Sequence, residues 1–101
     1  RCELTCGDGW YDLVRCVAHD IEQRKDPEHR VAIVNARNKI GQLYIGINGG
    51  GDYDSGLSAF ATYMSQFICE ECGERGAIRN VAGAVYVRCD THYQSMLRTI
   101  E

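Results

Sequence analysis

Residues 69–92 read CEECGERGAIRNVAGAVYVRCDTH, and they contain two pairs of metal-ligating residue types at the same short spacing. Cys69 and Cys72 form the first pair, and Cys89 and His92 form the second, with sixteen residues between the pairs. Two residues between paired ligands let one tight turn present both side chains to one ion. Zn²⁺ prefers thiolate and imidazole ligands in a tetrahedron. The stretch therefore predicts a zinc site, and sixteen intervening residues are enough for a β-hairpin.

The predicted zinc site is structural rather than catalytic, because four protein ligands leave no coordination position open for water. Three thiolates and one Zn²⁺ carry a charge of about −1 together, which would move the formal net charge from −3 to about −4. Binding energy on the order of 10 kcal/mol would then fold residues 69–101, which contain few large apolar side chains. The alternatives for the same four residues are two unrelated cysteine pairs or an iron–sulfur centre.

The composition is that of one small globular domain, with 101 residues of which 45% are hydrophobic and 25% charged. A net charge of −3 argues against a protein that binds polyanions without regard to sequence. No apolar run approaches the ~20 residues that span a bilayer, so no membrane partner is expected. Because the spacing of the cysteines favours metal binding over a disulfide framework, we expect a reducing compartment, the cytoplasm.

The first part of the chain predicts a helix followed by a β-hairpin. Residues 7–25 are amphipathic, with Asp8 as the expected N-cap, and the helix should end at Asp26-Pro27-Glu28 because proline cannot continue the ladder. The apolar side chains that recur at helical spacing are Trp10, Leu13, Val14, Val17 and Ile21. Residues 31–36 and 42–48 then predict two strands joined by a turn.

Three consecutive glycines, Gly49–Gly51, separate this hairpin from a second predicted helix that runs to about Ile68. Asp52, Asp54 or Ser55 is expected to cap this helix. Its expected inward stripe consists of Leu57, Phe60, Ala61, Met64 and Phe67.

The predicted fold class is α+β: helix, β-hairpin, helix, then a C-terminal zinc ribbon or knuckle with a short final helix. Residues 77–79 and 85–87 predict the short hairpin of this C-terminal part, and the second ligand pair leads into the last helix. We expect an α/β core of residues 1–68 and a zinc unit of residues 69–101, packed together as one unit.

The remaining cysteines give little support for catalysis. Cys16 and His19 lie three positions apart on the first helix, where they could act as a nucleophile and its base. No third residue that would orient the histidine is identifiable, so we expect no enzymatic activity, with a small hydrolase or nuclease as an alternative. Cys2 and Cys6 lack partners in register for a second metal, and a disulfide between them would require an oxidised sample.

Basic residues gather at both predicted hairpins and are the candidate contacts for a partner or for phosphates. They are Arg37 and Lys39 in the first hairpin, and Arg75, Arg79 and Arg88 around the second. Acidic residues surround the same ligand pairs, which makes a mixed solvated surface the simpler interpretation. Nucleic-acid binding by a zinc ribbon therefore stays as an alternative function.

Three blocks of the sequence together resemble a group of small uncharacterised zinc-knuckle proteins from bacteriophages and prophages. The first block is CGDGWYDL at residues 6–13, and the second is Arg37–Leu43, which is similar to the group's KEKFGGLRFY segment. The third block comprises Ile68–Gly76 and Arg88–His92, similar to CE-x-CG-x-PG and LCD-x-H. The blocks cover most of the chain in the same order.

The resemblance implies a phage or prophage origin, a zinc-bearing knuckle and the cytoplasm of a bacterial host cell, but it supplies no activity. The chain departs from the group where Arg75 replaces proline, where Tyr44 replaces arginine and where Asn38 replaces glutamate. The closed metal site, the acidic balance and the lack of a credible catalytic constellation lead us to expect a small zinc-stabilised protein-interaction module. The resemblance suggests a host or phage protein as its partner. An inhibitor or modulator of a host or defence factor is one form of this expectation.

Overall fold

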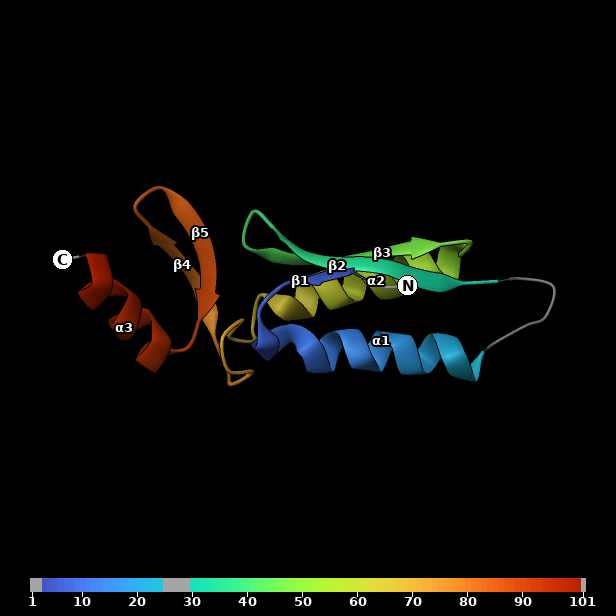
Figure 1. The fold of residues 1–101 in the computed structure, drawn as a ribbon, viewed down its shortest axis with the longest axis horizontal. Helices are drawn as coiled ribbons and strands as arrows, with labels where there is room; N and C mark the ends of the chain where they lie inside the picture. The colour runs from blue at the N-terminus through green and yellow to red at the C-terminus, as the bar shows by residue number, and fades with distance from the viewer. Residues whose placement is uncertain (1–2, 25–29, 101) are drawn as a thin grey trace.

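A computed structural model describes residues 3–24 and 30–100 of the chain, and it confirms the α+β class with the helices and hairpins in the predicted order (Figure 1). The elements are β1 (Glu3–Thr5), a 3-10 turn (Asp8–Trp10), α1 (Tyr11–Gln23), β2 (Ala32–Lys39), β3 (Gln42–Asn48), α2 (Asp52–Ser65), β4 (Ala77–Val81), β5 (Ala84–Arg88) and α3 (Asp90–Ile100).

The N-terminal sheet has the strand order β1-β2-β3, with β1 parallel to β2 and β2 antiparallel to β3. Strands β2 and β3 are joined at Ile40 and Gly41, which both have positive φ, as the two-residue turn of a tight hairpin requires. The short strand β1 was not predicted from the sequence. Three residues carry too little periodicity to signal a strand, and only pairing with β2 defines this one.

Helix α1 packs on the sheet through the predicted apolar stripe, which the structure confirms. Trp10, Val14, Val17 and Ile21 are buried in one cluster with Ala36, Leu43 and Ile45 of the sheet. The cap prediction was wrong: Gly7 precedes the 3-10 turn, and no side chain caps it. Asp8 is instead the first residue of that turn, so its side chain cannot serve as the N-cap. The predicted helix stop at Asp26-Pro27-Glu28 lies outside the described residues.

The predicted inward stripe of α2 is confirmed in part: Ala61 is buried and Leu57 packs against the core. Phe60 is 60% exposed, and Phe67, which follows the end of the helix, is 43% exposed, so the prediction was wrong for both; Ser65 is buried instead. The inward hydroxyl side chains bond to the backbone of the edge strand β3. Ser58 donates to the Ile45 carbonyl, Thr62 donates to the Leu43 carbonyl, and Ser65 Oγ accepts from the Leu43 N–H. A strand edge presents polar backbone groups, so the helix that covers it needs hydroxyls rather than an aliphatic stripe.

The C-terminal unit lies at one end of an elongated molecule of 54 × 22 × 22 Å (Figure 1). It consists of the ligand turn after Ile68, the antiparallel hairpin β4-β5 and helix α3. The hairpin turns at Ala82 and Gly83, which both have positive φ. Among the described residues, no helix is both long enough and apolar enough to cross a membrane.

Candidate metal centre

The first ligand pair is presented by a tight backbone turn that directly follows α2. The Cys69 N–H donates to the Glu74 carbonyl at 2.7 Å, and the Gly73 N–H donates to the Cys69 carbonyl at 2.9 Å. Gly73 has a φ of +83°, a conformation that side-chain-bearing residues rarely adopt. The turn therefore directs both the Cys69 and the Cys72 sulfur to the same side, as the sequence predicted.

The second ligand pair is positioned by the junction between β5 and α3. Cys89 follows the last residue of β5, and His92 lies in the first turn of α3. The Tyr93 N–H donates to the Cys89 carbonyl at 2.8 Å, and the His92 N–H lies 3.4 Å from the Cys89 sulfur. The helix start thus fixes the imidazole beside the Cys89 thiol.

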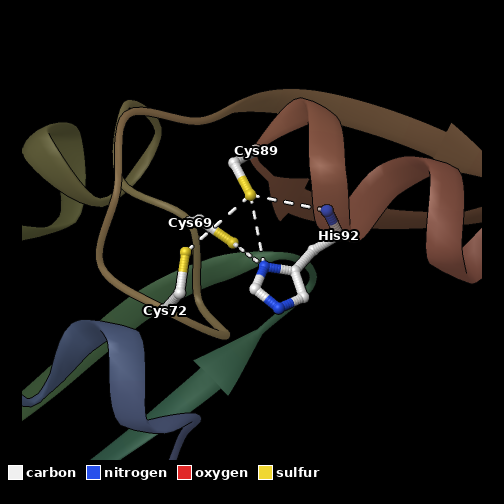
Figure 2. Close-up of side chains that lie close together, drawn as sticks. All are labelled: Cys69, Cys72, Cys89 and His92. Carbon is white, nitrogen blue, oxygen red and sulfur yellow. Dashed lines mark hydrogen bonds between the residues drawn. The ribbon is translucent and has the colours of Figure 1, made fainter.

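The four side chains converge from both turns onto a common point (Figure 2). Their ligand atoms all lie within 4.8 Å of one another. The Cys72 and Cys89 sulfurs are 3.8 Å apart, and His92 Nδ1 lies 3.2 Å from the Cys89 sulfur and 3.7 Å from that of Cys69. A tetrahedral Zn²⁺ would separate two sulfurs by about 3.8 Å, and a sulfur from a nitrogen by about 3.6 Å. The cluster therefore has the dimensions of one four-coordinate metal site, with Nδ1 as the imidazole donor.

The pKa values of the Cys69 and Cys72 thiols are shifted in opposite directions. Burial opposes ionisation of Cys69, but backbone N–H groups of Cys89, Cys72 and Glu71 donate toward its sulfur and lower its pKa to about 7. The Glu74 N–H favours the Cys72 thiolate, yet desolvation and the neighbouring sulfurs of Cys69 and Cys89 outweigh it and raise the Cys72 pKa to about 11. A divalent cation would remove the mutual repulsion of the thiolates and hold all of them ionised.

Glu70, between the two cysteines of the first turn, joins the metal centre to the N-terminal unit. Its side chain is 7% exposed. Oε2 accepts the Gly7 N–H at 3.0 Å, and Oε1 accepts the Asn38 side-chain amide at 2.8 Å and the Arg88 guanidinium at 3.3 Å. A buried carboxylate with these three donors is fully paired, and it ties three separate segments to the ligand turn.

The segment CGDGW is the platform on which this ligand turn rests. The Gly9 N–H donates to the Glu70 carbonyl, and the Trp10 indole donates to the Ile68 carbonyl at 2.8 Å. A Cβ atom at Gly9 would lie 2.0 Å from the Cys69 carbonyl oxygen, and one at Gly7 would lie 2.6 Å from that of Glu70. Both glycines are therefore required by close backbone approach. The two glycines are visible in the sequence, but only the tertiary structure shows which backbone atoms they contact.

The structure places the five basic candidates in three different settings. Arg79 donates to the Arg88 carbonyl and to Asp90, while Arg88 pairs with Glu70, so both guanidinium groups are engaged within the C-terminal unit. Arg75 is exposed. In the first hairpin, the Arg37 and Lys39 charges each lie 5.3 Å from the ring centre of Tyr44, and both side chains are exposed. Of the five predicted phosphate contacts, Arg37 and Lys39 are therefore the two that lie beside each other on the surface.

Outside the cluster, Cys16 is a free thiol. Cys16 and His19 are both exposed on α1, and Cys6 is buried in the apolar core. Cys2, the other half of the disulfide considered from the sequence, lies outside the described residues.

Comparisons of the chain with protein-family models, with curated proteins and with solved structures find no significant match. The functional inference therefore depends on the geometry of this molecule alone.

Proposed function

We propose that the protein is a small zinc-stabilised module that acts by binding another protein. Zn²⁺ would be held by Cys69, Cys72, Cys89 and His92 as a structural ion. The dimensions and the donor types of the cluster support this choice of metal. Four protein donors fill a tetrahedron, which favours a binding role over a catalytic one. In the phage setting that the sequence motifs suggest, the partner would be a host or phage protein in the bacterial cytoplasm.

The observation that carries the binding role is the tip of the β2-β3 hairpin. Ile40 is 81% exposed there, with a φ of +53°. A β-branched residue in this conformation is strained by about 1–3 kcal/mol, and solvent exposure offers no compensation. Asn-Gly is the pair that this turn favours, and it would be both relaxed and polar. A strained apolar side chain at an exposed tip supports a role in contacting a partner.

The surroundings of Ile40 fit a protein partner. Arg37, Lys39 and Tyr44 lie beside the turn, and together with Ile40 they form what we term the tip face. Tyrosine and arginine are enriched among the residues that dominate binding energy at protein interfaces. The tip face would therefore accept a surface with an apolar pocket and a nearby carboxylate.

Nucleic-acid binding is the second candidate function, because Tyr44 between two cations is also a stacking platform for a base. Against it, Arg79 and Arg88 are engaged internally, and the chain carries a net charge of −3. Arg79 and Arg88 are therefore not available to neutralise phosphates.

The variant Ile40→Asn tests the proposed function, because it should change stability and binding in opposite directions. We expect the free energy of unfolding to rise by about 1 kcal/mol as the turn relaxes. We also expect retention of a host protein from bacterial lysate by the immobilised metal-loaded chain to fall at least ~10-fold. Quantitative mass spectrometry of the retained proteins and urea unfolding measure the two effects.

The matched control is Ile78→Asn, which replaces an exposed isoleucine on β4 and should leave retention unchanged. Equal retention by both variants and the unmodified chain would exclude the tip face as the binding surface. Binding to DNA or RNA that weakens steeply with salt and is lost in Arg37→Ala would favour the second candidate instead.

A further inference from the structure

The solvent side of α2 and the turn that follows it carry four exposed aromatic side chains. Tyr53, Phe60, Tyr63 and Phe67 are 59%, 60%, 56% and 43% exposed, and we term them the aromatic stripe. Helix α2 packs against β3 and against α1, and the stripe lies on its remaining side. Tyr63 and Phe67 also contact each other edge to face, with ring centres 5.3 Å apart. A contiguous apolar surface of this kind on a small protein marks an interaction site.

Three residues of the stripe, Phe60, Tyr63 and Phe67, lie within the longest uncharged part of the chain. From Ser55 to Cys69 there is no Asp, Glu, Lys, Arg or His, although a quarter of all residues are charged. Tyr53 lies between Asp52 and Asp54, and the Arg24 guanidinium is 4.0 Å from its ring centre. A surface that selects a different protein usually carries charges that complement its partner. The uncharged part of the stripe can meet a second copy of itself without like-charge repulsion, even though the whole chain carries −3.

The spacing of the stripe is that of a coiled-coil seam. Tyr53, Phe60 and Phe67 follow one another at intervals of seven residues, and Gly56 and Tyr63 occupy the positions three residues after the first two. The flanking positions Leu57, Ala59 and Met64 are uncharged as well, and Asp52 flanks the seam at the N-terminal end of the helix. Such a seam packs against another helix, with side chains of one helix entering gaps of the other.

We propose that the aromatic stripe is a homodimer interface, in which α2 packs antiparallel against α2 of a second copy. A two-fold axis at Phe60 places the two Phe60 rings together and Tyr53 of each copy against Phe67 of the other. The same register places Gly56 against Tyr63 of the second copy. Nothing lies within 4 Å of a Cβ atom built at Gly56, so this glycine leaves a gap that the opposing ring fills.

The expected dimer is small and concentration-dependent. A half-exposed aromatic side chain offers about 100 Å² for burial, so four per copy provide about 800 Å² in total. This area lies below the ~1,200 Å² of stable interfaces and corresponds to weak association. The proposed dimer involves only α2 and the turn after it. Its test is therefore independent of the tip face and of the proposed binding of another protein.

The test is the mass of the full metal-loaded chain by sedimentation equilibrium, from micromolar to millimolar protein. We expect the average mass to rise from monomer to dimer with concentration. Phe60→Glu brings two charges together on the two-fold axis and should weaken association at least ~100-fold. Ile78→Glu is the matched control, since Ile78 is 54% exposed on β4, and it should leave association unchanged.

Gly56→Leu tests the antiparallel register without risk to the fold, because open space surrounds this position and leucine favours a helix. It should weaken association about 10-fold by filling the gap that receives Tyr63. A parallel dimer would place Gly56 against Gly56, so tighter association of this variant would overturn the proposed register. A monomer mass at every concentration, or equal weakening by Phe60→Glu and Ile78→Glu, would overturn the proposal.

Discussion

The N-terminal and C-terminal units of this molecule are stabilised by different means. Of the twelve buried apolar side chains in the described residues, nine lie in the N-terminal unit up to residue 68, among them Trp10, Leu43 and Ile45. In the described part of residues 69–100, the buried apolar side chains are Cys69, Val81 and Val87. The first unit has a conventional core, whereas the second has too little apolar burial to offset the entropy of ordering its chain. We therefore expect the second unit to depend on a metal ion held by its Cys/His cluster and on its contacts with the first unit.

Metal removal should have the largest effect, because it should destabilise the C-terminal unit much more than the N-terminal unit. We expect chelation, or Cys89→Ala, to unfold residues 69–100 while the N-terminal unit keeps its helices, because structural Zn²⁺ contributes on the order of 10 kcal/mol to folding. Amide NMR spectra of the loaded and stripped chain resolve the two units separately. If the C-terminal amide signals did not change after complete metal removal, the C-terminal unit would not depend on the metal for its fold. Cys16→Ala, at an exposed cysteine outside the cluster, is the control.

The contact between the two units should break when Gly9 gains a side chain. Gly9→Ala would place a Cβ atom 2.0 Å from the Cys69 carbonyl oxygen, and the neighbouring contact is backbone that cannot swing away. We expect a loss of about 3 kcal/mol or more in the free energy of unfolding by urea. Gly51→Ala is the matched control, because nothing lies within 4 Å of its built Cβ. Similar losses in both variants would show that Gly9 has no special packing role.

Within the N-terminal unit, acid should act through Asp54, which joins α2 to α1. Arg24 donates to Asp54 at 2.8 Å and the Gly51 N–H donates at 3.1 Å, and these bonds lower the Asp54 pKa. A lowered pKa in the folded state stabilises the protein at pH values above about 4, and this contribution disappears as pH falls through the folded pKa.

Asp54→Asn should therefore cost on the order of 1 kcal/mol at neutral pH and progressively less as the pH falls below about 4. Urea unfolding at a series of pH values measures this difference. Asp12→Asn, at an exposed ion pair with Arg15, should change little at any pH. A cost at Asp54 that stays constant with pH would contradict a role for its charge.

The smallest expected effect concerns the hydroxyls between α2 and β3. Thr62→Val keeps the shape of the side chain but leaves the Leu43 carbonyl without the donor that lies 2.7 Å away. We expect a loss of about 1 kcal/mol in the free energy of unfolding of the N-terminal unit. Thr99→Val in α3, at an exposed hydroxyl, is the control. No loss in Thr62→Val would mean that apolar contacts alone hold α2 to the strand edge.

The sequence by itself determined the α+β class, the inward stripe of α1 and the four side chains of the metal centre. Period and spacing are local properties, and a C-x-x-C turn can be recognised without knowing what surrounds it. Only the tertiary structure decided that α2 turns hydroxyls inward and aromatics outward, and that Glu70 and Gly9 join the two units. These features depend on which backbone groups of a distant segment need a partner, and no local pattern carries that information.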